Sequence, residues 1–376
     1  MAWPVLPEVQ TPYFVIDEEI LDTNLQILQY VMQESGAKIL LAQKAFSVYQ
    51  VYPQIREYLC GSAASGLYEA RLGHEEMGGE THVFCPAYQD HWFDELLEYA
   101  DHLVFNSYAQ WEHFRERALN AGKSCGLRIN PAHSTQDGAL YDPCTPGSRF
   151  GILRADLEGK DLSGIDGLHF HTLCEQNVDA LVETLEVVER DFGDILHKMK
   201  WLNLGGGHHI TRIDYDVETL IETVRRLRET YNLEVYLEPG EAVVLNAGYM
   251  VTSVVDLLHN EMDIAVLDTS AACHIPDVIE MPYRPPLEGS GEAGEFDYTY
   301  RLGGPTCLAG DVIGDYSFKA PLKIGDKLIF NDMALYTMVK TNTFNGMPLP
   351  NIYSGDAFTT FNAIREFGYE DFKSRL

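Results

Sequence analysis

Basic residues are scarce in this sequence of 376 residues. It has 27 lysines and arginines against 57 aspartates and glutamates, which gives a formal net charge of −30 at pH 7. Such an excess of negative charge repels the phosphates of nucleic acids and the surfaces of anionic membranes. We therefore expect neither as a partner, and we expect the overall field to favour cationic small molecules.

Signals for disulfide bonding, export and membrane insertion are also lacking. The seven cysteines are odd in number and include no C-x-x-C pair, so they predict neither a disulfide framework nor a zinc site. The first seven residues lack the basic start and apolar run of a signal peptide. The most apolar long stretch, residues 243–258, contains Asn246 and Asp256 and is too polar to span a membrane. We expect a cytoplasmic protein.

Short apolar runs alternate with segments of helical periodicity over most of the first 240 residues. In residues 217–230, for example, Leu220, Ile221, Val224 and Leu227 are spaced three and four apart. Eight strand-like runs that alternate with helices fit a closed (β/α)8 barrel, a TIM-like fold, better than an open sheet. The runs are 38–43, 59–63, 81–85, 101–105, 125–129, 167–171, 201–204 and 234–237.

The pattern changes after residue 240, where helical periodicity nearly disappears. Residues 11–17 form a further strand-like run that precedes the first barrel helix. We predict two domains: a barrel over 18–242, and a C-terminal β-sandwich or β-barrel over 243–376 that the N-terminal strand within 1–17 completes. The strands expected in the second domain include 243–257, 263–268, 327–330 and 334–340.

Lys44 follows the first apolar run, where a charged residue is poorly placed for solubility. A low dielectric favours the neutral amine, which is the form that attacks a carbonyl to make a Schiff base. Gly205, Gly206 and Gly207 follow the seventh run, and the N–H groups of such a turn can close around a phosphate. A lysine for an aldehyde and a glycine turn for a phosphate together suggest pyridoxal phosphate.

Other polar residues also follow strand-like runs, at the end where such barrels place their active sites. This agreement across several strand ends is the strongest signal in the sequence. The residues in question are Lys44, Asn106, Arg128, His171, the glycines 205–207 and Glu238.

Lys44, His171 and Glu238 also have simpler interpretations. Lys44 could be a surface charge, and Glu238 could be an ordinary turn residue. His169 and His171 share a strand face and could form half of a metal site with His208 or His209. The glycine turn would then have no purpose, so we expect no metal.

Several segments in combination resemble the fold-type III pyridoxal-phosphate decarboxylases, the relatives of ornithine, arginine and diaminopimelate decarboxylases with an alanine-racemase-like barrel. They are most similar to the carboxynorspermidine/carboxyspermidine decarboxylase branch. Each segment alone is a weak signal, but together they extend from Tyr13 to about Gly346. The segments are Ala42-Gln-Lys-Ala45, Gly167-Leu-His-Phe-His171, Leu204-Gly-Gly-Gly-His-His-Ile-Thr211, Glu238-Pro-Gly-Glu-Ala242, Gly304-Pro-Thr-Cys307 and Asp332-Met-Ala-Leu-Tyr-Thr337.

The resemblance implies a role for each matching residue. Lys44 would form the Schiff base with pyridoxal phosphate, and Glu238 would keep the pyridine nitrogen protonated. His171 would stack against the ring, and Arg128 would approach the cofactor.

Cys307 would return a proton to the substrate carbon after CO2 has left, because a thiol is mostly protonated near neutral pH. Without its Gly-Pro-Thr context it could equally be a small buried hydrophobe, and Tyr336 a packed core tyrosine. The backbone of Gly205, Gly206 and Gly207 and the hydroxyl of Tyr336 would hold the phosphate, and Gly240 is a further cofactor-binding residue.

The departures from the relatives indicate the substrate. Many relatives have arginine where this chain has Glu241, and diaminopimelate decarboxylases have arginine at the position of Glu280. Asp277 adds a further carboxylate three residues before Glu280. We predict that Glu241, Asp277 and Glu280 bind the amines of a long cationic tail and repel a second carboxylate.

The resemblance also implies a homodimer with shared active sites, in which Arg149 of one subunit pairs with an aspartate at the position of Asp311 in the other. Cys307 would reach across that interface.

The implied activity is decarboxylation of carboxynorspermidine or carboxyspermidine in polyamine biosynthesis. One alternative is a decarboxylase for diaminopimelate, ornithine or arginine, which Glu241 and Glu280 disfavour. Another is an inactive homologue that binds polyamines or a partner enzyme, which would not need Lys44, Glu238 and Cys307 together. A metal-dependent hydrolase is more remote.

Overall fold

The computed structural model describes residues 9–136, 138, 142–356 and 360–376. The chain folds into two compact units, one of residues 24–243 and one that combines residues 1–23 with 244–376. The divisions fall inside α1 (Glu18–Ser35) and inside the short helix α8 (Glu241–Val244), whereas the predicted domain boundaries lie at residues 17–18 and 242–243.

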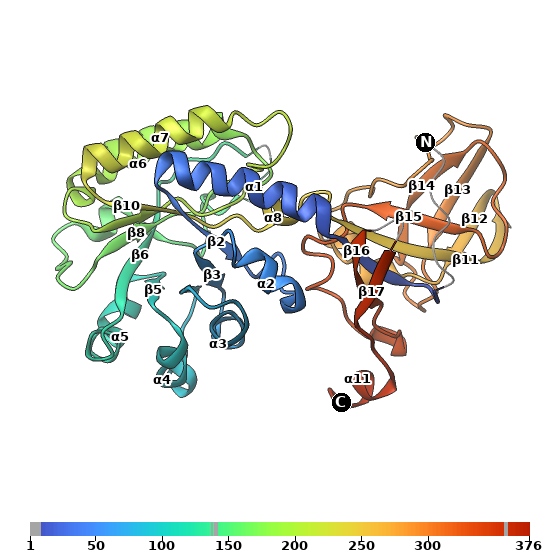
Figure 1. The fold of residues 1–376 in the computed structure, drawn as a ribbon, viewed down its shortest axis with the longest axis horizontal. Helices are drawn as coiled ribbons and strands as arrows, with labels where there is room; N and C mark the ends of the chain where they lie inside the picture. The colour runs from blue at the N-terminus through green and yellow to red at the C-terminus, as the bar shows by residue number, and fades with distance from the viewer. Residues whose placement is uncertain (1–8, 137, 139–141, 357–359) are drawn as a thin grey trace. The chain divides into compact units, whose positions relative to one another are not determined.

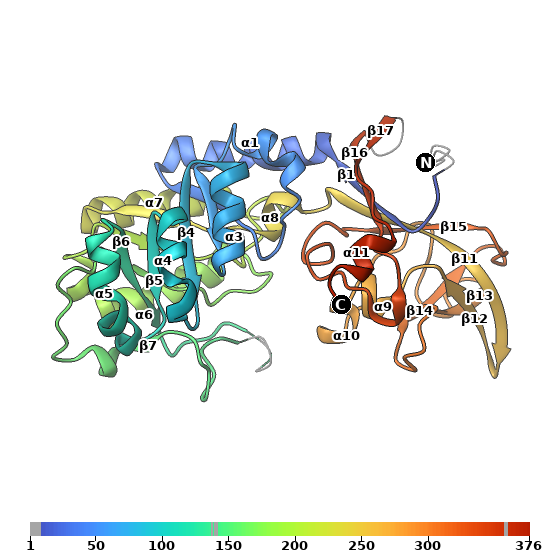
Figure 2. The same ribbon diagram turned by 90° about the horizontal axis from the view of Figure 1, so that it is seen from below.

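The first unit is a closed barrel of eight parallel strands, as predicted. Each strand pairs with the next, β10 pairs with β2, and the β5–β6 pairing completes the ring. Helices surround the strands on the outside (Figures 1 and 2). The barrel strands are β2 (Lys38–Ala42), β3 (Gly61–Ala64), β4 (Glu80–Cys85), β5 (His102–Phe105), β6 (Ser124–Asn130), β8 (Gly167–His169), β9 (Trp201–Asn203) and β10 (Glu234–Leu237).

The barrel helices follow the predicted periodicity. In α7, Asp216 caps the first turn through the N–H of Thr219, and Asn232 ends the helix in the left-handed conformation. Besides α1, the helices are α2 (Tyr52–Ile55), α3 (Leu67–Leu72), α4 (Asp90–Tyr99), α5 (Tyr108–Asn120), α6 (Val178–Leu196) and α7 (Val217–Tyr231).

Bulky side chains fill the barrel core, including a cluster of Leu40, Val104, Trp201 and Tyr236. Glycine is needed on the strands that face Trp201: a Cβ at Gly126 or Gly167 would lie 2.2 or 2.0 Å from the indole. The long segment after β6, expected to be an elaborated loop, contains a short strand, β7 (Ile152–Leu153), and a 3-10 turn over Arg154–Leu157.

The second unit is built on a mixed sheet in the order β14-β13-β12-β11-β1-β16-β17, with β15 also paired to β11. Strand β1 lies antiparallel to β11 and parallel to β16, so the N-terminal strand completes this sheet as predicted. The strands are β1 (Tyr13–Asp17), β11 (Gly248–Asn260), β12 (Met262–Leu267), β13 (Tyr298–Gly303), β14 (Val312–Phe318), β15 (Lys327–Asn331), β16 (Asn351–Asp356) and β17 (Thr360–Arg365). The short helices are α9 (Ala271–His274), α10 (Asp277–Glu280) and α11 (Tyr369–Lys373).

Two predictions about this unit are wrong in detail. Residues 334–340 form consecutive turns and not a strand, because Asp332 and Tyr336 have φ values of 58° and 51°, which an extended strand does not allow. The run predicted to start at residue 243 begins as helix α8, and β11 starts at Gly248. Among the described residues, we find no helix with the length and apolar character needed to cross a bilayer.

Candidate active site

Lys44 lies in the turn directly after β2, at the carboxyl end of the barrel strands. Its Nζ is 3.1 Å from Nε2 of His171, which follows β8. The lysine keeps exposed surface, yet enough protein surrounds it that desolvation is the largest cause of its lowered pKa, with the charge of Arg128 second. The nearby carboxylates of Glu238 and Glu241 act in the opposite direction. The site therefore raises the fraction of neutral amine, as predicted from the sequence.

His171 is held from both sides of its ring. Nδ1 lies 3.1 Å from both the N and the O of Gly206, while Nε2 faces Lys44. Burial, followed by the charges of Lys44 and Arg128, holds the pKa of His171 well below its ordinary range. The ring is thus a neutral imidazole fixed at the end of β8.

Arg128 supports this histidine through its main chain. The guanidinium is buried between the rings of Phe84 and Phe150, 4.5 Å from each centroid, and Nη2 donates to the carbonyl oxygen of His171 at 2.9 Å. Burial lowers the pKa of Arg128 to about 10, although the carboxylate of Glu238 partly offsets that effect. The group stays charged at neutral pH and fixes the position from which the imidazole projects.

Glu238 follows β10, and its carboxylate has two donors. Nδ2 of Asn203 donates to Oε1 at 2.7 Å, and Nε2 of His169 lies 3.2 Å from Oε2. Burial opposes the charge, but the interactions with His169, the charge of His82 and the bond from Asn203 together lower the pKa of Glu238 to about 2. The barrel therefore holds a carboxylate that stays ionised although it is largely enclosed.

His169 and Asn203 were not among the predicted site residues. His169 is the last residue of β8, and Asn203 is the last residue of β9. The strand-end rule that selected Glu238 therefore also applies to these two residues. His169 bonds Glu238, His171 faces Lys44, and His208 bonds the hydroxyl of Tyr215 at 2.6 Å. These histidines are directed at separate partners and not at a common metal position.

The glycine turn packs directly against Glu238 and His171. Gly205 and Gly207 have φ values of 70° and 85°, which L side chains rarely adopt. A Cβ on Gly206 would lie 2.1 Å from the carbonyl oxygen of Glu238. The turn therefore needs glycine for its conformation and for its close contact with the end of β10. Gly240 is close-packed as well, since its Cβ would lie 2.5 Å from that of Ala45.

Glu241 begins α8 and is largely buried. Its Oε2 lies 3.0 Å from Nε2 of His209, which follows the glycine turn. The predicted partner of this carboxylate is a substrate amine, and within the barrel itself the carboxylate lies beside the imidazole of His209. Cys174 is a further side chain near this position; its pKa is raised to about 11 by burial and by the charge of Glu241.

Asp277, Glu280 and Tyr336 belong to the second unit and are linked by a lysine that the sequence analysis did not select. Nζ of Lys340 donates to Asp277 and, at 2.8 Å, to Oε2 of Glu280. The same ammonium lies 5.4 Å from the ring centroid of Tyr336. The two predicted substrate-binding carboxylates therefore have a cation of their own.

Cys307 is exposed in the turn after β13, and its N–H donates to Oδ1 of Asn345 at 2.7 Å. Asp311, predicted to pair across a dimer, is buried. Its carboxylate accepts from Ser270 at 2.9 and 3.0 Å, from the N–H of Ala272 at 3.2 Å, and from Thr306 at 2.6 and 3.2 Å. Asp311 therefore also fixes the turn that carries Cys307.

The predicted partner, Arg149, lies in the barrel unit. Its guanidinium packs 4.3 Å from the centroid of Phe150, and its carbonyl oxygen accepts from Nδ2 of Asn106. The pairing of Arg149 with Asp311 stays a prediction.

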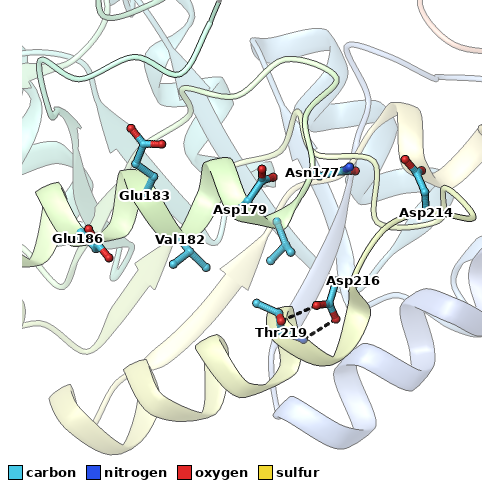
Figure 3. Close-up of a pocket in the computed structure, with 9 residues that line it drawn as sticks. Asn177, Asp179, Val182, Glu183, Glu186, Asp214, Asp216 and Thr219 are labelled. Carbon is cyan, nitrogen blue, oxygen red and sulfur yellow. Dashed lines mark hydrogen bonds between the residues drawn. The ribbon is translucent and has the colours of Figure 1, made fainter.

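Two other polar features of the barrel contain none of the predicted site residues. At the amino ends of the strands, Glu80, His82 and His102 form the one group of metal-ligating side chains among the described residues, but Nζ of Lys38 lies 2.8 Å from Glu80 and already supplies a cation there. A hollow of about 540 Å³ lies at the beginnings of α6 and α7 (Figure 3). Five of its lining residues are acidic: Asp179, Glu183, Glu186, Asp214 and Asp216.

Comparison with known proteins agrees with the resemblance seen in the sequence. Residues 14–334 match the family described as pyridoxal-dependent decarboxylase, C-terminal sheet domain. The chain is 44% identical to a carboxynorspermidine/carboxyspermidine decarboxylase of Campylobacter jejuni, with 98% of this chain and 99% of the relative covered. It is 43% identical to a carboxyaminopropylagmatine decarboxylase of Synechocystis, with 99% and 97% covered.

Solved structures show the same relationship. The crystal structure of carboxynorspermidine decarboxylase from Campylobacter jejuni, complexed with norspermidine, superposes with a TM-score of 0.90 at 42% identity. It covers 98% of this chain and all of that chain. Diaminopimelate decarboxylase from Helicobacter pylori, at 15% identity and a TM-score of 0.83, shares the fold.

Proposed function

The chain belongs to the pyridoxal-dependent decarboxylases, and from that premise we propose that it decarboxylates carboxynorspermidine and carboxyspermidine to norspermidine and spermidine. One observation carries the proposal: a lysine with a lowered pKa and an ionised, enclosed carboxylate, Glu238, lie at the same end of the barrel. The similarity to the Campylobacter jejuni enzyme over nearly the whole chain supports the choice of substrate.

The donor set at this end of the barrel fits pyridoxal phosphate. The neutral form of Lys44 is the nucleophile that an aldehyde requires. Glu238 would accept a hydrogen bond from a protonated pyridine nitrogen, and its lowered pKa keeps it in the accepting form. The main chain of Gly205, Gly206 and Gly207 would hold the phosphate; Gly240 and, from the second unit, the hydroxyl of Tyr336 stay predicted cofactor-binding groups. When bound, the cofactor supplies an electron-accepting ring that stabilises the charge left by departing CO2.

The surrounding residues keep these groups in place. His169 and Asn203 hold the two carboxylate oxygens of Glu238. The guanidinium of Arg128 holds His171 through a hydrogen bond to its carbonyl oxygen. The imidazole of His171 would cover one face of the cofactor ring, and its lowered pKa keeps a second positive charge away from Lys44. Arg128 therefore acts by positioning His171.

Cys307 would protonate the substrate carbon after decarboxylation. Its thiol is exposed, and the turn that carries it is fixed by Asn345 and Asp311. We place the working site in a homodimer, with Cys307 supplied by one subunit and Lys44 by the other, and with Arg149 and Asp311 as the candidate interface pair. All seven cysteines are free, which supports a reducing cytoplasm as the working compartment.

The tail of the substrate would be recognised by carboxylates. Carboxynorspermidine and carboxyspermidine are α-amino acids with two further amines along the tail. Glu241, Asp277 and Glu280 would bind those cations, and they would repel the second carboxylate of diaminopimelate.

A second candidate substrate is carboxyaminopropylagmatine, whose tail ends in a guanidinium and not in a primary ammonium. The observation in its favour is the relative from Synechocystis, which is as similar to this chain as the Campylobacter jejuni enzyme is, at 43% against 44% identity.

The proposal is tested by incubating the purified protein with pyridoxal phosphate and each candidate substrate, and by measuring CO2 release and amine products by mass spectrometry. We expect norspermidine and spermidine from their carboxylated precursors, and at least about a hundredfold lower kcat/KM with diaminopimelate or ornithine, whose tails leave buried polar groups unpaired. A Lys44→Ala variant is the inactive control. Turnover of diaminopimelate at the highest rate would refute the proposal.

A further inference from the structure

Lys340 is the cation that the sequence analysis missed beside the predicted substrate-binding carboxylates. Its Nζ bonds Oδ1 of Asp277 and Oε2 of Glu280, which stand three residues apart in the short helix α10. One lysine therefore bridges both carboxylates of this segment.

The ion pair between Lys340 and Asp277 is largely buried on the side of the aspartate. That side chain is 11% exposed, against 32% for Lys340 and 57% for Glu280. Burial opposes the charge of Lys340, but the bonds and charges of Asp277 and Glu280 outweigh it and raise its pKa. The lysine is therefore a permanent positive charge at the segment.

Lys340 also joins α10 to the turn that carries Tyr336. Its N–H donates to the carbonyl oxygen of Tyr336 at 3.1 Å, and its ammonium lies 5.4 Å from the centroid of that ring. The candidate phosphate-binding tyrosine and the candidate tail-binding carboxylates thus share one residue, which limits how either can move.

Two consequences for a substrate cation follow from this bridge. The pair Asp277 and Glu280 carries two negative charges, but with Lys340 the segment has a net charge of −1. In addition, one oxygen of each carboxylate is already bonded to an ammonium group. A substrate cation must therefore bind beside Lys340.

We propose that Lys340 is a specificity-determining residue that makes this segment accept a primary ammonium in preference to a guanidinium. The inference rests on the proposed function, because it concerns the tail of the same substrate. A guanidinium binds most strongly to a carboxylate that offers both oxygens in parallel. Lys340 already bonds one oxygen of each carboxylate, so a guanidinium that uses both oxygens in parallel must share one of them with the ammonium of Lys340. A primary ammonium is a compact charge whose donors can each use a single oxygen.

The test compares two amine products that differ at the tail end, norspermidine and aminopropylagmatine. Their dissociation constants are measured by calorimetry with the cofactor-loaded wild type and with Lys340→Met and Lys340→Arg. Turnover of the two carboxylated substrates is measured in parallel. We expect the wild type to favour norspermidine, and we expect that preference to fall about tenfold in Lys340→Met, since a bidentate carboxylate becomes available.

Lys340→Arg keeps a permanent positive charge at this position, so its preference should stay within about threefold of the wild type. Lys200→Met is the matched control, because it removes another lysine–aspartate pair, with Asp166 at 2.8 Å, away from the predicted site. Folding of each variant is checked by its melting temperature relative to the wild type. If Lys340→Met folds poorly, Lys340→Gln replaces it.

An unchanged preference in folded Lys340→Met, or in Lys340→Gln where that variant replaces it, would overturn the inference. An equal loss of affinity for both amines would also overturn it, because that result marks a purely structural residue. Failure of the proposed function is seen separately, as absence of turnover by the wild type. The binding preference can still be measured in that case, so the two claims are distinguishable.

Discussion

Replacing Glu238 with glutamine removes a charge that the barrel stabilises. The pKa of Glu238 is lowered from its ordinary value of 4.5 to about 2. Burial works against the ionised form, whereas His169, His82 and Asn203 favour it more strongly. This difference in pKa between the folded and unfolded states corresponds to about 3 kcal/mol of folding stability at neutral pH. Each pKa unit is a tenfold change in the ionisation constant and is worth about 1.4 kcal/mol.

The pH dependence follows from the sign of this change. Because the pKa is lower in the folded state, the contribution is fully present above pH 4.5 and is lost as the pH falls toward 2. We expect Glu238→Gln to lower the melting temperature by roughly 6 to 12 °C at pH 7. The difference in melting temperature between Glu238→Gln and the wild type should be smaller at pH 3.5 than at pH 7.

The assay is scanning calorimetry of protein stripped of cofactor, so that a change in cofactor affinity does not contribute to the melting temperature. Glu112→Gln, an exposed position on α5, is the control and should change stability by less than about 0.5 kcal/mol. A destabilisation by Glu238→Gln below about 1 kcal/mol, or a gap that is as large at pH 3.5 as at pH 7, would refute this reasoning.

The remaining predictions concern turnover and assembly. Glu241→Gln should raise KM for carboxynorspermidine about tenfold and leave the cofactor spectrum intact, since it removes a charged partner of a substrate amine; normal KM with loss of the cofactor would contradict its assignment. Cys307→Ala should lower kcat by about a hundredfold or more with little change in KM, because it removes a general acid. Arg149→Ala should weaken dimerisation and activity together in analytical ultracentrifugation and assays across the same concentrations, whereas a fully active monomer would exclude the shared site.

The barrel could be predicted because its signal is local and repeated. Each strand-like run has a short apolar pattern of its own, and eight such runs at regular intervals leave few alternative folds. The rule that active-site residues follow barrel strands then selected Lys44, His171 and Glu238. The structure places all three at the carboxyl end of the barrel strands.

The second unit was harder to predict because its turns depend on backbone conformation more than on composition. Residues 334–340 have the apolar composition that is typical of a strand, but positive φ values at Asp332 and Tyr336 bend the chain. Neither residue is a glycine, so the sequence carries no obvious sign of the turn.

The partners of the predicted site residues were the least predictable feature. His209 beside Glu241, and Lys340 beside Asp277, are distant in sequence from the residues they bond. Sequence patterns identify the charged residues themselves, but they do not reveal which other chain segment lies beside them. Only the three-dimensional arrangement shows that Lys340 lies beside the carboxylates predicted to bind the substrate tail.

Reduction of the cofactor-loaded protein with borohydride, followed by proteolysis and mass spectrometry, identifies the lysine that binds the cofactor aldehyde. We predict a single pyridoxyl group on Lys44, with none in a Lys44→Ala variant. A pyridoxyl group on another lysine, or none at all in a preparation that still releases CO2 from carboxynorspermidine, would contradict the site described above.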